Sequence, residues 1–248
     1  MARIITISNH KGGVGKTTSA INIGAGLNKM GKKVLLVDAD PQANLTQSLG
    51  IEEPETSIYG ALKGDYPLEP LEILPGLDLV GSTLDLSGAE VELSTEKRRE
   101  FILKNILKPL KSKYEFIFID SPPSLGLLTI NALTASQEIF IPLQAEYLAL
   151  RGLTKLQEVV ERISERLNPD LFIGAVFITQ YDSRTVLHRD VRNSIKNHFG
   201  DKLLSTAIRR NISLAEAPTK GVDIFRYDPN SAGAEDYLSL SREILETE

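Results

Sequence analysis

The sequence predicts a single α/β domain, built on a twisted, mainly parallel sheet with helices on both faces. Short and nearly continuous apolar runs recur along the whole chain, as expected of parallel strands buried on both faces. Segments with apolar residues three or four positions apart lie between these runs, as in helices that connect parallel strands. Many α/β proteins of 248 residues are one domain, so we expect one domain over residues 1–248.

Seven segments are predicted as strands: 4–8, 33–40, 77–82, 115–122, 138–143, 172–179 and 203–208. An apolar stripe over 153–167 predicts a helix, which Asn168-Pro169 would end. A similar stripe over 102–110 predicts another helix. Residues 52–75 are rich in proline, glycine and acidic residues, and they are predicted as surface connections.

Composition and charge narrow the classes of function. The hydrophobic and charged fractions, 42% and 25%, are those of an ordinary soluble protein, and the absence of cysteine excludes disulfides and iron–sulfur ligation. No apolar run is long enough for a membrane-spanning helix or a signal peptide, so we expect a cytoplasmic protein. The net charge is −5, yet residues 182–226 carry nine Lys and Arg against five acids. This segment is either a local anion-binding face or a solvated mixture of charges.

A glycine-rich segment, NHKGGVGKTT at residues 9–18, follows the first predicted strand and precedes a helical pattern. Its GKT triplet at 15–17 matches the second half of the phosphate-binding loop G-x-x-x-x-G-K-[ST]. His10 stands where that loop has its first glycine, and Lys11 follows it. The segment is therefore either an imperfect loop or one adapted to a different task.

The local context favours phosphate binding over a turn used only for packing. A strand, a glycine-rich turn and a helix together aim backbone N–H groups and a positive helix end at one point. The glycines let the backbone approach an anion closely. We expect Lys16 to reach the terminal phosphates of a nucleotide and the Thr17 hydroxyl to bind Mg²⁺.

Three aspartates follow predicted strands. Asp120 ends one apolar run, and Asp38 and Asp40 end another. The carboxyl ends of parallel strands form the edge where ligands bind, and an aspartate there suits Mg²⁺ held through water. Alternation along the strand places Asp38 and Asp40 on the same side. One such aspartate is usually a turn residue, but three near one loop favour a site for a nucleotide with Mg²⁺.

Four motifs together resemble the ParA/Soj partition ATPases, which belong to the deviant-Walker class of P-loop NTPases that also contains MinD. The motifs are KGGVGKTT at 11–18, DADPQAN at 38–44, FIDSPPSLGLLTINAL at 118–133 and RNISLAEAP at 210–218. The resemblance covers nearly the whole chain and implies ATP and Mg²⁺ as cofactors. The implied nucleotide-binding residues of the loop are Lys11, Gly12, Gly13, Val14, Gly15, Lys16, Thr17 and Thr18.

The resemblance also explains the unusual loop and assigns roles around it. The first glycine is not required in this class, and Lys11 is the signature lysine that reaches the partner's nucleotide in a homodimer formed on ATP binding. Lys11, Lys16 and Asp40 are thus expected to be catalytic, with Asp40 orienting the attacking water. Thr17, Asp40 and Asp120 are expected at the metal, with support from Asp38 as a cofactor-binding residue.

Further positions follow from the same resemblance. The stretch Arg209-Arg210-Asn211 matches one that borders the adenine, although relatives usually carry proline where Arg209 stands. Arg184 matches a DNA-contacting arginine, and relatives often have a second one where this chain has Ser213. Arg189, Arg192 and Arg210 are candidates to compensate, or are solvated surface. Arg151 stands where relatives have glutamate.

The implied function is an ATPase that dimerises on ATP, binds DNA without sequence preference and drives chromosome or plasmid partition with a ParB-like partner. We expect the protein to be associated with the nucleoid. We also expect no N-terminal helix-turn-helix, because the loop begins within ten residues of Met1. The acidic tail at 235–248 argues against binding to anionic membranes. Two alternatives remain: an ATPase that positions a protein cargo without DNA, and a small-molecule ligase such as a carboxylate-activating synthetase.

Overall fold

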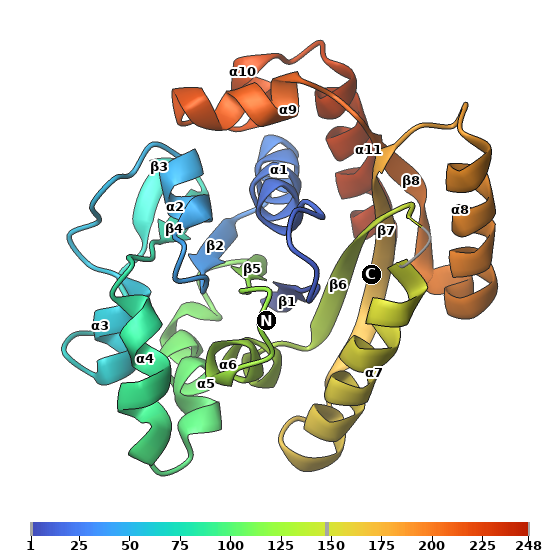
Figure 1. Ribbon diagram of the computed structural model, residues 1–248. Coiled ribbons are helices and arrows are strands. Elements are labelled where there is room, and N and C mark those ends of the chain that lie inside the picture. Colours follow the sequence, from blue (N-terminus) through green and yellow to red (C-terminus); the bar gives the residue numbers. More distant parts are fainter. Residues whose placement is uncertain (1, 147–148, 248) are drawn as a thin grey trace.

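The computed structural model describes residues 2–146 and 149–247. Its strands form one eight-stranded sheet, in the order β3-β4-β2-β5-β1-β6-β7-β8 (Figure 1). The neighbouring strands are parallel except for the antiparallel pair β3–β4. The strand bounds are β1 Arg3–Ile7, β2 Val34–Asp38, β3 Leu71–Leu74, β4 Leu77–Val80, β5 Phe116–Asp120, β6 Glu138–Gln144, β7 Phe172–Tyr181 and β8 Leu203–Arg209.

Helices cover both faces of this sheet. Their bounds are α1 Lys16–Lys29, α2 Asn44–Ser48, α3 Ile58–Lys63, α4 Leu86–Glu92, α5 Ile102–Leu107, α6 Leu127–Ala135, α7 Ala149–Arg166, α8 Val186–Phe199, α9 Ser213–Glu216, α10 Ile224–Tyr227 and α11 Ala232–Glu246. In Figure 1, α1 and α11 lie on one face, and α5, α6 and α7 lie on the other. The predicted fold class is therefore confirmed.

The central strands are buried on both faces because their alternate side chains enter different cores. Ile5 and Ile7 of β1 pack with α1 and α11, whereas Ile4 packs with α3 to α6. A third core lies between α7, α8 and the strands β6 and β7. Each strand residue thus removes apolar surface from water, which is the main stabilising contribution in a fold of this kind.

Residues 52–75 contain more regular structure than the sequence predicts. The helix α3 and the edge strand β3 both lie in this stretch, so its interpretation as surface connections was wrong. The cause for β3 is its place at the edge of the sheet: its four residues are exposed or half-buried, with Leu71 45% exposed. A short edge strand has no buried face to produce an apolar alternation, so its pattern resembles that of a loop.

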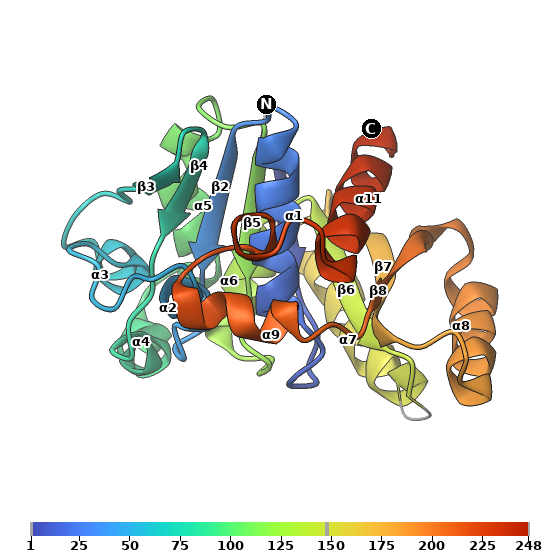
Figure 2. The same ribbon diagram turned by 90° about the horizontal axis from the view of Figure 1, so that it is seen from above.

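The parallel strands bring their carboxyl ends to one edge. Figure 2 shows the sheet from above, with the loop between β1 and α1 at one edge and both termini at the opposite edge. Near the termini, the Arg3 guanidinium donates to the carbonyl oxygen of Ile244 at 3.0 Å. In the described part of the chain, no helix is both long and apolar enough to cross a membrane.

Candidate active site at the carboxyl edge of the sheet

The glycine-rich loop joins β1 to α1, and side chains of β6 and β7 hold it from behind. Gln144 Nε2 and Gln180 Nε2 both donate to the carbonyl oxygen of Gly13, at 2.9 and 3.0 Å. Thr179 Oγ1 donates to the carbonyl oxygen of Val14 at 2.8 Å. A trans peptide directs its N–H opposite to its C=O. The N–H groups that follow these two carbonyls are therefore turned away from β6 and β7, as an anion-binding loop requires.

Backbone conformation at the loop explains its glycines. Gly13 and Gly15 have φ values of +73° and +88°, in the left-handed region that residues with a side chain rarely adopt. The helix α1 begins immediately after Gly15, so its positive N-terminal end lies at the loop. Gln180, which bonds the loop, also has a positive φ of +51°, and such strain is often found at functional sites.

A cavity of about 440 Å³, here called the loop cavity, lies in front of this loop. Its walls contain seven of the predicted residues: Gly12, Gly13, Gly15, Lys16, Thr17, Thr18 and Asp40. The side chain of Lys16 is almost buried, and burial lowers the pKa of its ammonium group, whereas Asp120 and Asp40 raise it. An ammonium group with little water around it interacts strongly with an anion such as a phosphate.

Asp120 and Thr17 form the part of the site that suits Mg²⁺. The Thr17 hydroxyl donates to Asp120 Oδ2 at 2.6 Å, and Asp120 is 1% exposed. Burial raises the pKa of Asp120, and the charge of Asp38 raises it further. Among the described residues, Oδ1 of Asp120 finds no hydrogen-bond partner. A hydrated divalent cation beside Thr17 would provide both a water donor and a compensating charge, so these residues fit Mg²⁺.

The metal would not be held by protein carboxylates alone. Within the ranges that the structure describes, no group of three or more His, Asp or Glu side chains is placed to hold a metal ion. Mg²⁺ prefers to keep several waters and is commonly bound through one or two protein groups and the phosphates of a nucleotide. The Thr17 hydroxyl, a water on Asp120 and phosphate oxygens would form such a set.

The other two predicted aspartates have different surroundings. Asp40 lies beyond the end of β2, lines the loop cavity and accepts a bond from the N–H of Gln42 at 2.9 Å. Asp38 is wholly buried: its Oδ2 accepts from the N–H and the hydroxyl of Thr46, at 2.9 and 2.7 Å, and its Oδ1 accepts from the N–H of Asp40. Burial raises the pKa of Asp38 to about 6, although the bonds from Thr46 lower it. Asp38 therefore shapes the turn that carries Asp40.

A second cavity of about 290 Å³, here called the β8 cavity, shares Gly15, Thr18 and Gln180 with the loop cavity. Its other walls come from Arg209-Arg210-Asn211 at the end of β8, from α9 and from Tyr237 of α11. The Tyr237 side chain is buried, and its hydroxyl lies 3.0 Å from that of Ser19 in α1. The β8 cavity therefore adjoins the loop cavity beside the start of α1.

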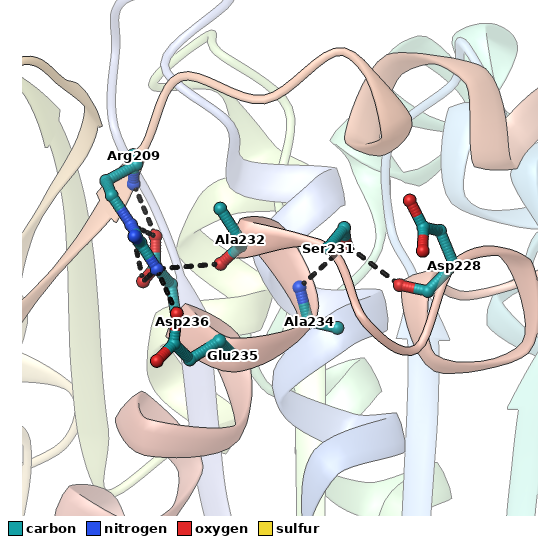
Figure 3. Close-up of polar contacts among 7 residues, drawn as sticks. All are labelled: Arg209, Asp228, Ser231, Ala232, Ala234, Glu235 and Asp236. Atoms are coloured by element: carbon teal, nitrogen blue, oxygen red, sulfur yellow. Dashed lines mark hydrogen bonds and ion pairs between the residues drawn. The ribbon is translucent and has the colours of Figure 1, made fainter.

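Asn211 and Arg209, both predicted near the base, form different contacts. Asn211 Oδ1 accepts from the N–H of Leu214 at 3.2 Å, and this bond fixes the turn into α9. The Arg209 guanidinium instead points toward the first turn of α11, as Figure 3 shows, and binds Asp236 and Glu235. Arg209 is therefore a wall residue of the β8 cavity whose charged group is engaged by another helix.

Lys11 also lies apart from its own loop cavity. Its Nζ forms an ion pair with Glu146 at 2.5 Å and donates to Gln144 Oε1 at 3.3 Å, beyond the end of β6. The backbone of the loop is fixed at this point, because the N–H of Lys11 donates to Asn9 Oδ1 at 3.0 Å. The neighbouring His10 has a buried Nδ1 without a hydrogen-bond partner among the described residues, and burial lowers its pKa.

Three of the predicted DNA-contacting arginines lie on or near α8. Arg184 is 89% exposed and forms a two-armed ion pair with Asp182, at 3.0 and 2.9 Å, which holds the pKa of Asp182 down at about 2. Arg189 donates to the carbonyl oxygens of Ser183 and Arg184, at 2.8 and 3.3 Å. These two arginines therefore lie together at the start of α8.

The other two arginines are Arg192, farther along α8, and Arg210, which follows β8. Arg192 donates to the carbonyl oxygen of Ser205 in β8 at 2.8 Å, and its guanidinium lies 5.7 Å from the centre of the Tyr181 ring. Arg210 lines the β8 cavity and is exposed. Arg151 lies in α7, but its side chain is outside the described residues.

Several residues of the site were missed in the sequence. Gln144, Thr179 and Gln180 hold the loop from behind, and Gln42, Asn44 and Ser48 line the loop cavity. The latter three lie close to the predicted Asp40, so sequence proximity was a usable signal. Gln144, Thr179 and Gln180 gave no signal in the sequence. They lie near the loop only because β6 and β7 follow β1 in the order of the sheet.

The fold and the loop define a P-loop ATPase. A family model described as an AAA domain matches residues 2–173. The chain is 49% identical to the chromosome-partitioning ATPase Soj of Treponema pallidum, over 99% of this chain and 98% of that protein. It is 44% identical to the chromosome partitioning protein ParA of Caulobacter vibrioides, over 99% of this chain and 95% of that protein. The chain therefore belongs to the Soj/ParA family of partition ATPases.

A solved structure that is similar to this chain contains a nucleotide analogue and magnesium. The cobyrinic acid a,c-diamide synthase of Mycobacterium smegmatis, with a bound ATP analogue and magnesium, is 35% identical and has a TM-score of 0.87. The match covers 99% of this chain and 95% of that one. A protein of the same fold thus holds a nucleotide and the metal that the loop cavity and Asp120 fit.

Proposed function

We propose that this protein is a Mg²⁺-dependent ATPase that dimerises on binding ATP, coats DNA without sequence preference and works with a ParB-like partner in chromosome or plasmid partition. Its place of action is the nucleoid in the cytoplasm. Both relatives named above are described as chromosome-partitioning proteins, and they match nearly the full chain. We further propose that residues 1–248 act as one ATPase domain.

The chemistry at one site follows from the geometry. The loop amides and Lys16 bind and orient the phosphates, and Thr17 with Asp120 would hold Mg²⁺, which supplies charge neutralisation when bound. Asp40 lines the same cavity, which supports a role in accepting a hydrogen bond from the attacking water. Phosphoryl transfer needs charge neutralisation and alignment more than covalent participation. The residues of one subunit's site would supply the alignment, and further positive charge at the terminal phosphate would complete the neutralisation.

The position of Lys11 is the observation that carries the proposal of a dimer. Its ammonium group is half-exposed and pairs with Glu146 at the surface, while Lys16 serves the loop cavity. A surface lysine next to the phosphate loop can release Glu146 and reach a nucleotide bound by a facing copy. Lys11 would then neutralise charge near the scissile bond only after dimerisation.

The proposed DNA contact is the exposed start of α8. Arg184 and Arg189 lie there at the surface, and arginines bind phosphate oxygens without reading base sequence. Their present partners are Asp182 and backbone carbonyls, which DNA phosphates would replace. Binding of this kind falls steeply as the salt concentration rises.

DNA co-sedimentation tests this function. Purified protein is centrifuged with linear duplex DNA, in Mg²⁺ with ATP, with ADP or without nucleotide, at several salt concentrations. We expect the protein to sediment with DNA only in ATP, and less so as salt rises. If it stays in the supernatant in ATP even at low salt, the DNA-binding proposal fails and an ATPase that positions a protein cargo becomes the better account.

The synthetase named in the Mycobacterium smegmatis structure represents the other class of function, a small-molecule ligase. Its identity to this chain is 35%, against 49% for the Soj protein. We expect a nucleotide with its phosphates in the loop cavity to place its base in the β8 cavity, because the two cavities share Gly15, Thr18 and Gln180. The higher identity of the partition proteins favours partition.

A further inference from the structure

The end of β8 and the start of α11 are joined by a cluster of bonds centred on Arg209, shown in Figure 3. Arg209 Nε donates to both carboxylate oxygens of Asp236 at 3.0 Å, and its second arm donates to Asp236 Oδ1 at 2.7 Å. The backbone N–H of Arg209 donates to the same carboxylate at 2.8 Å. Glu235 Oε2 accepts a further bond from the guanidinium at 2.5 Å. We refer to these contacts as the Arg209 clasp.

Burial makes the clasp stronger than an ordinary surface ion pair. The side chain of Asp236 is 10% exposed, whereas that of Glu235 is 71% exposed. The Arg209–Asp236 pair is two-armed, and its carboxylate is largely shielded from water, although the Arg209 side chain is 49% exposed. A two-armed pair with one buried partner is more rigid and contributes more than a pair in which both partners are exposed. Glu235 adds a weaker, salt-sensitive contact. Most of the effect of the clasp should therefore depend on Asp236.

The clasp lies between two walls of the β8 cavity. On one side, the chain continues from Arg209 into Arg210 and Asn211, and all three residues line the cavity. On the other side, the residue after Asp236 is Tyr237, which lines the cavity from α11. The distance between these walls thus depends on how β8 is fixed to α11.

The start of α11 is itself firmly held, so the clasp has a fixed anchor. Ser231 caps the helix by accepting from the N–H of Ala234 at 3.2 Å, and its hydroxyl donates to the carbonyl oxygen of Asp228 at 2.8 Å (Figure 3). The buried hydroxyl of Tyr237 meets that of Ser19 in α1, the helix that begins at the phosphate loop. The anchor is therefore connected through Tyr237 to α1, which begins at the phosphate loop.

We propose that Arg209 is a positioning residue for the nucleotide base: by holding the segment 209–211 against α11, it sets the width of the β8 cavity in which the base binds. Its guanidinium does not contact the base but acts through the walls on either side of it. This inference rests on the proposed nucleotide site. Breaking the clasp should therefore lower the affinity for ligands that carry a base and leave the affinity for ligands without a base unchanged.

The test compares ligands with and without a base. Binding of Mg²⁺-ADP and of Mg²⁺-tripolyphosphate to the full chain is measured by calorimetry for the wild type, Arg209→Ala, Asp236→Asn and the double variant. We expect each single substitution to raise the Kd for ADP about tenfold, which corresponds to ~1.4 kcal/mol. The Kd for tripolyphosphate should change less than about twofold. The double variant should be no weaker than either single variant, because both remove the same interaction.

Arg226→Ala provides a matched control. Arg226 Nε pairs with the buried Asp223 at 2.5 Å, so this variant also removes an arginine bonded to a buried aspartate. Within the described part of the chain, Arg226 is not among the residues that line the β8 cavity. Its affinity for ADP should stay within about twofold of the wild type, whereas an equal loss would show that any such pair matters and would overturn the specific role of Arg209.

Two further outcomes would also overturn the inference. An unchanged Kd for ADP in Arg209→Ala would show that the clasp does not position the base. Equal losses for ADP and tripolyphosphate would indicate a general disturbance of the fold. If Arg209→Ala does not fold, Asp236→Asn, which keeps the shape of the side chain, provides the same comparison. Failure of the wild type to bind ADP would instead reject the nucleotide site itself.

Discussion

The loop cavity and the start of α8 hold their positive charges in opposite ways. At the loop, Lys16 is 8% exposed, and side chains from β6 and β7 fix the backbone behind it. At α8, Arg184 is 89% exposed and its nearest partner is Asp182, two residues away. The first region is organised before a ligand arrives, whereas the second must exchange its own partners for those of a ligand.

This difference predicts two kinds of binding within one molecule. A preorganised, dry site binds one shape of anion tightly, because little order is lost on binding. Exposed arginine side chains are flexible, and they bind many anions weakly and in a salt-dependent way. The proposed function uses both kinds, one to recognise ATP and one to hold DNA of any sequence.

Removing Lys16 should have the largest effect. Lys16→Ala deletes the buried ammonium group of the loop cavity. We expect the Kd for Mg²⁺-ATP to rise about a thousandfold, because two opposite charges in contact at a partly buried site attract by about 4 kcal/mol. Calorimetry with the purified protein checks this. Lys11→Ala is the matched control, since Lys11 pairs with Glu146 at the surface and its loss should leave ATP binding by the monomer nearly unchanged. Equal losses in both variants would contradict the division of roles between the two lysines.

Asp40→Ala should separate binding from hydrolysis. Asp40 lines the loop cavity, and its loss removes the group that orients water, so we expect turnover to fall about a hundredfold or more. The affinity for ATP should remain close to that of the wild type, because Lys16, Thr17 and the loop amides are intact. Steady-state phosphate release and calorimetry on the same preparation check both statements. Wild-type turnover would reject Asp40 as the water-orienting residue.

Arg184→Ala should have the smallest effect. We expect DNA affinity in ATP to fall about threefold to tenfold and the slope of log K against log salt to decrease by about one, with ATP affinity unchanged. Lys108→Ala removes the same charge from a different basic region, a cavity of about 660 Å³ along α5 that shares no lining residue with the loop cavity. If both variants lose the same DNA affinity, binding follows net charge and not the α8 face.

Features that leave a pattern along the chain could be predicted from the sequence. The central strands were predicted because residues on both of their faces are buried and form continuous apolar runs. In β5, Ile117 packs on one face and Phe118 on the other. The loop was predicted because its chemistry fixes the order of residues along the chain. The edge strand β3 was not, since its exposed Leu71 and Glu72 produce no buried alternation.

Long-range partners were beyond the reach of sequence patterns. Gln180 reaches Gly13 across 167 positions, and Arg209 meets Asp236 across 27. The stretch 209–211 lines the β8 cavity, and its contact with the adenine stays a prediction. The direction of the Arg209 side chain depends on where α11 begins. Such contacts follow from sheet order and helix docking, which only the fold determines.

The central claim is that Lys11 serves the nucleotide of a facing copy, and a mixing experiment tests it most directly. Lys11→Ala and Asp40→Ala proteins are each expected to be nearly inactive alone. In a heterodimer, the site in the Lys11→Ala subunit keeps its own Asp40 and receives Lys11 from the Asp40→Ala subunit, so it is complete. Cross-linking of differently tagged subunits establishes that they co-assemble in ATP. The account predicts that mixing restores ATP hydrolysis, up to one working site per heterodimer, and co-assembly without any return of hydrolysis would contradict it.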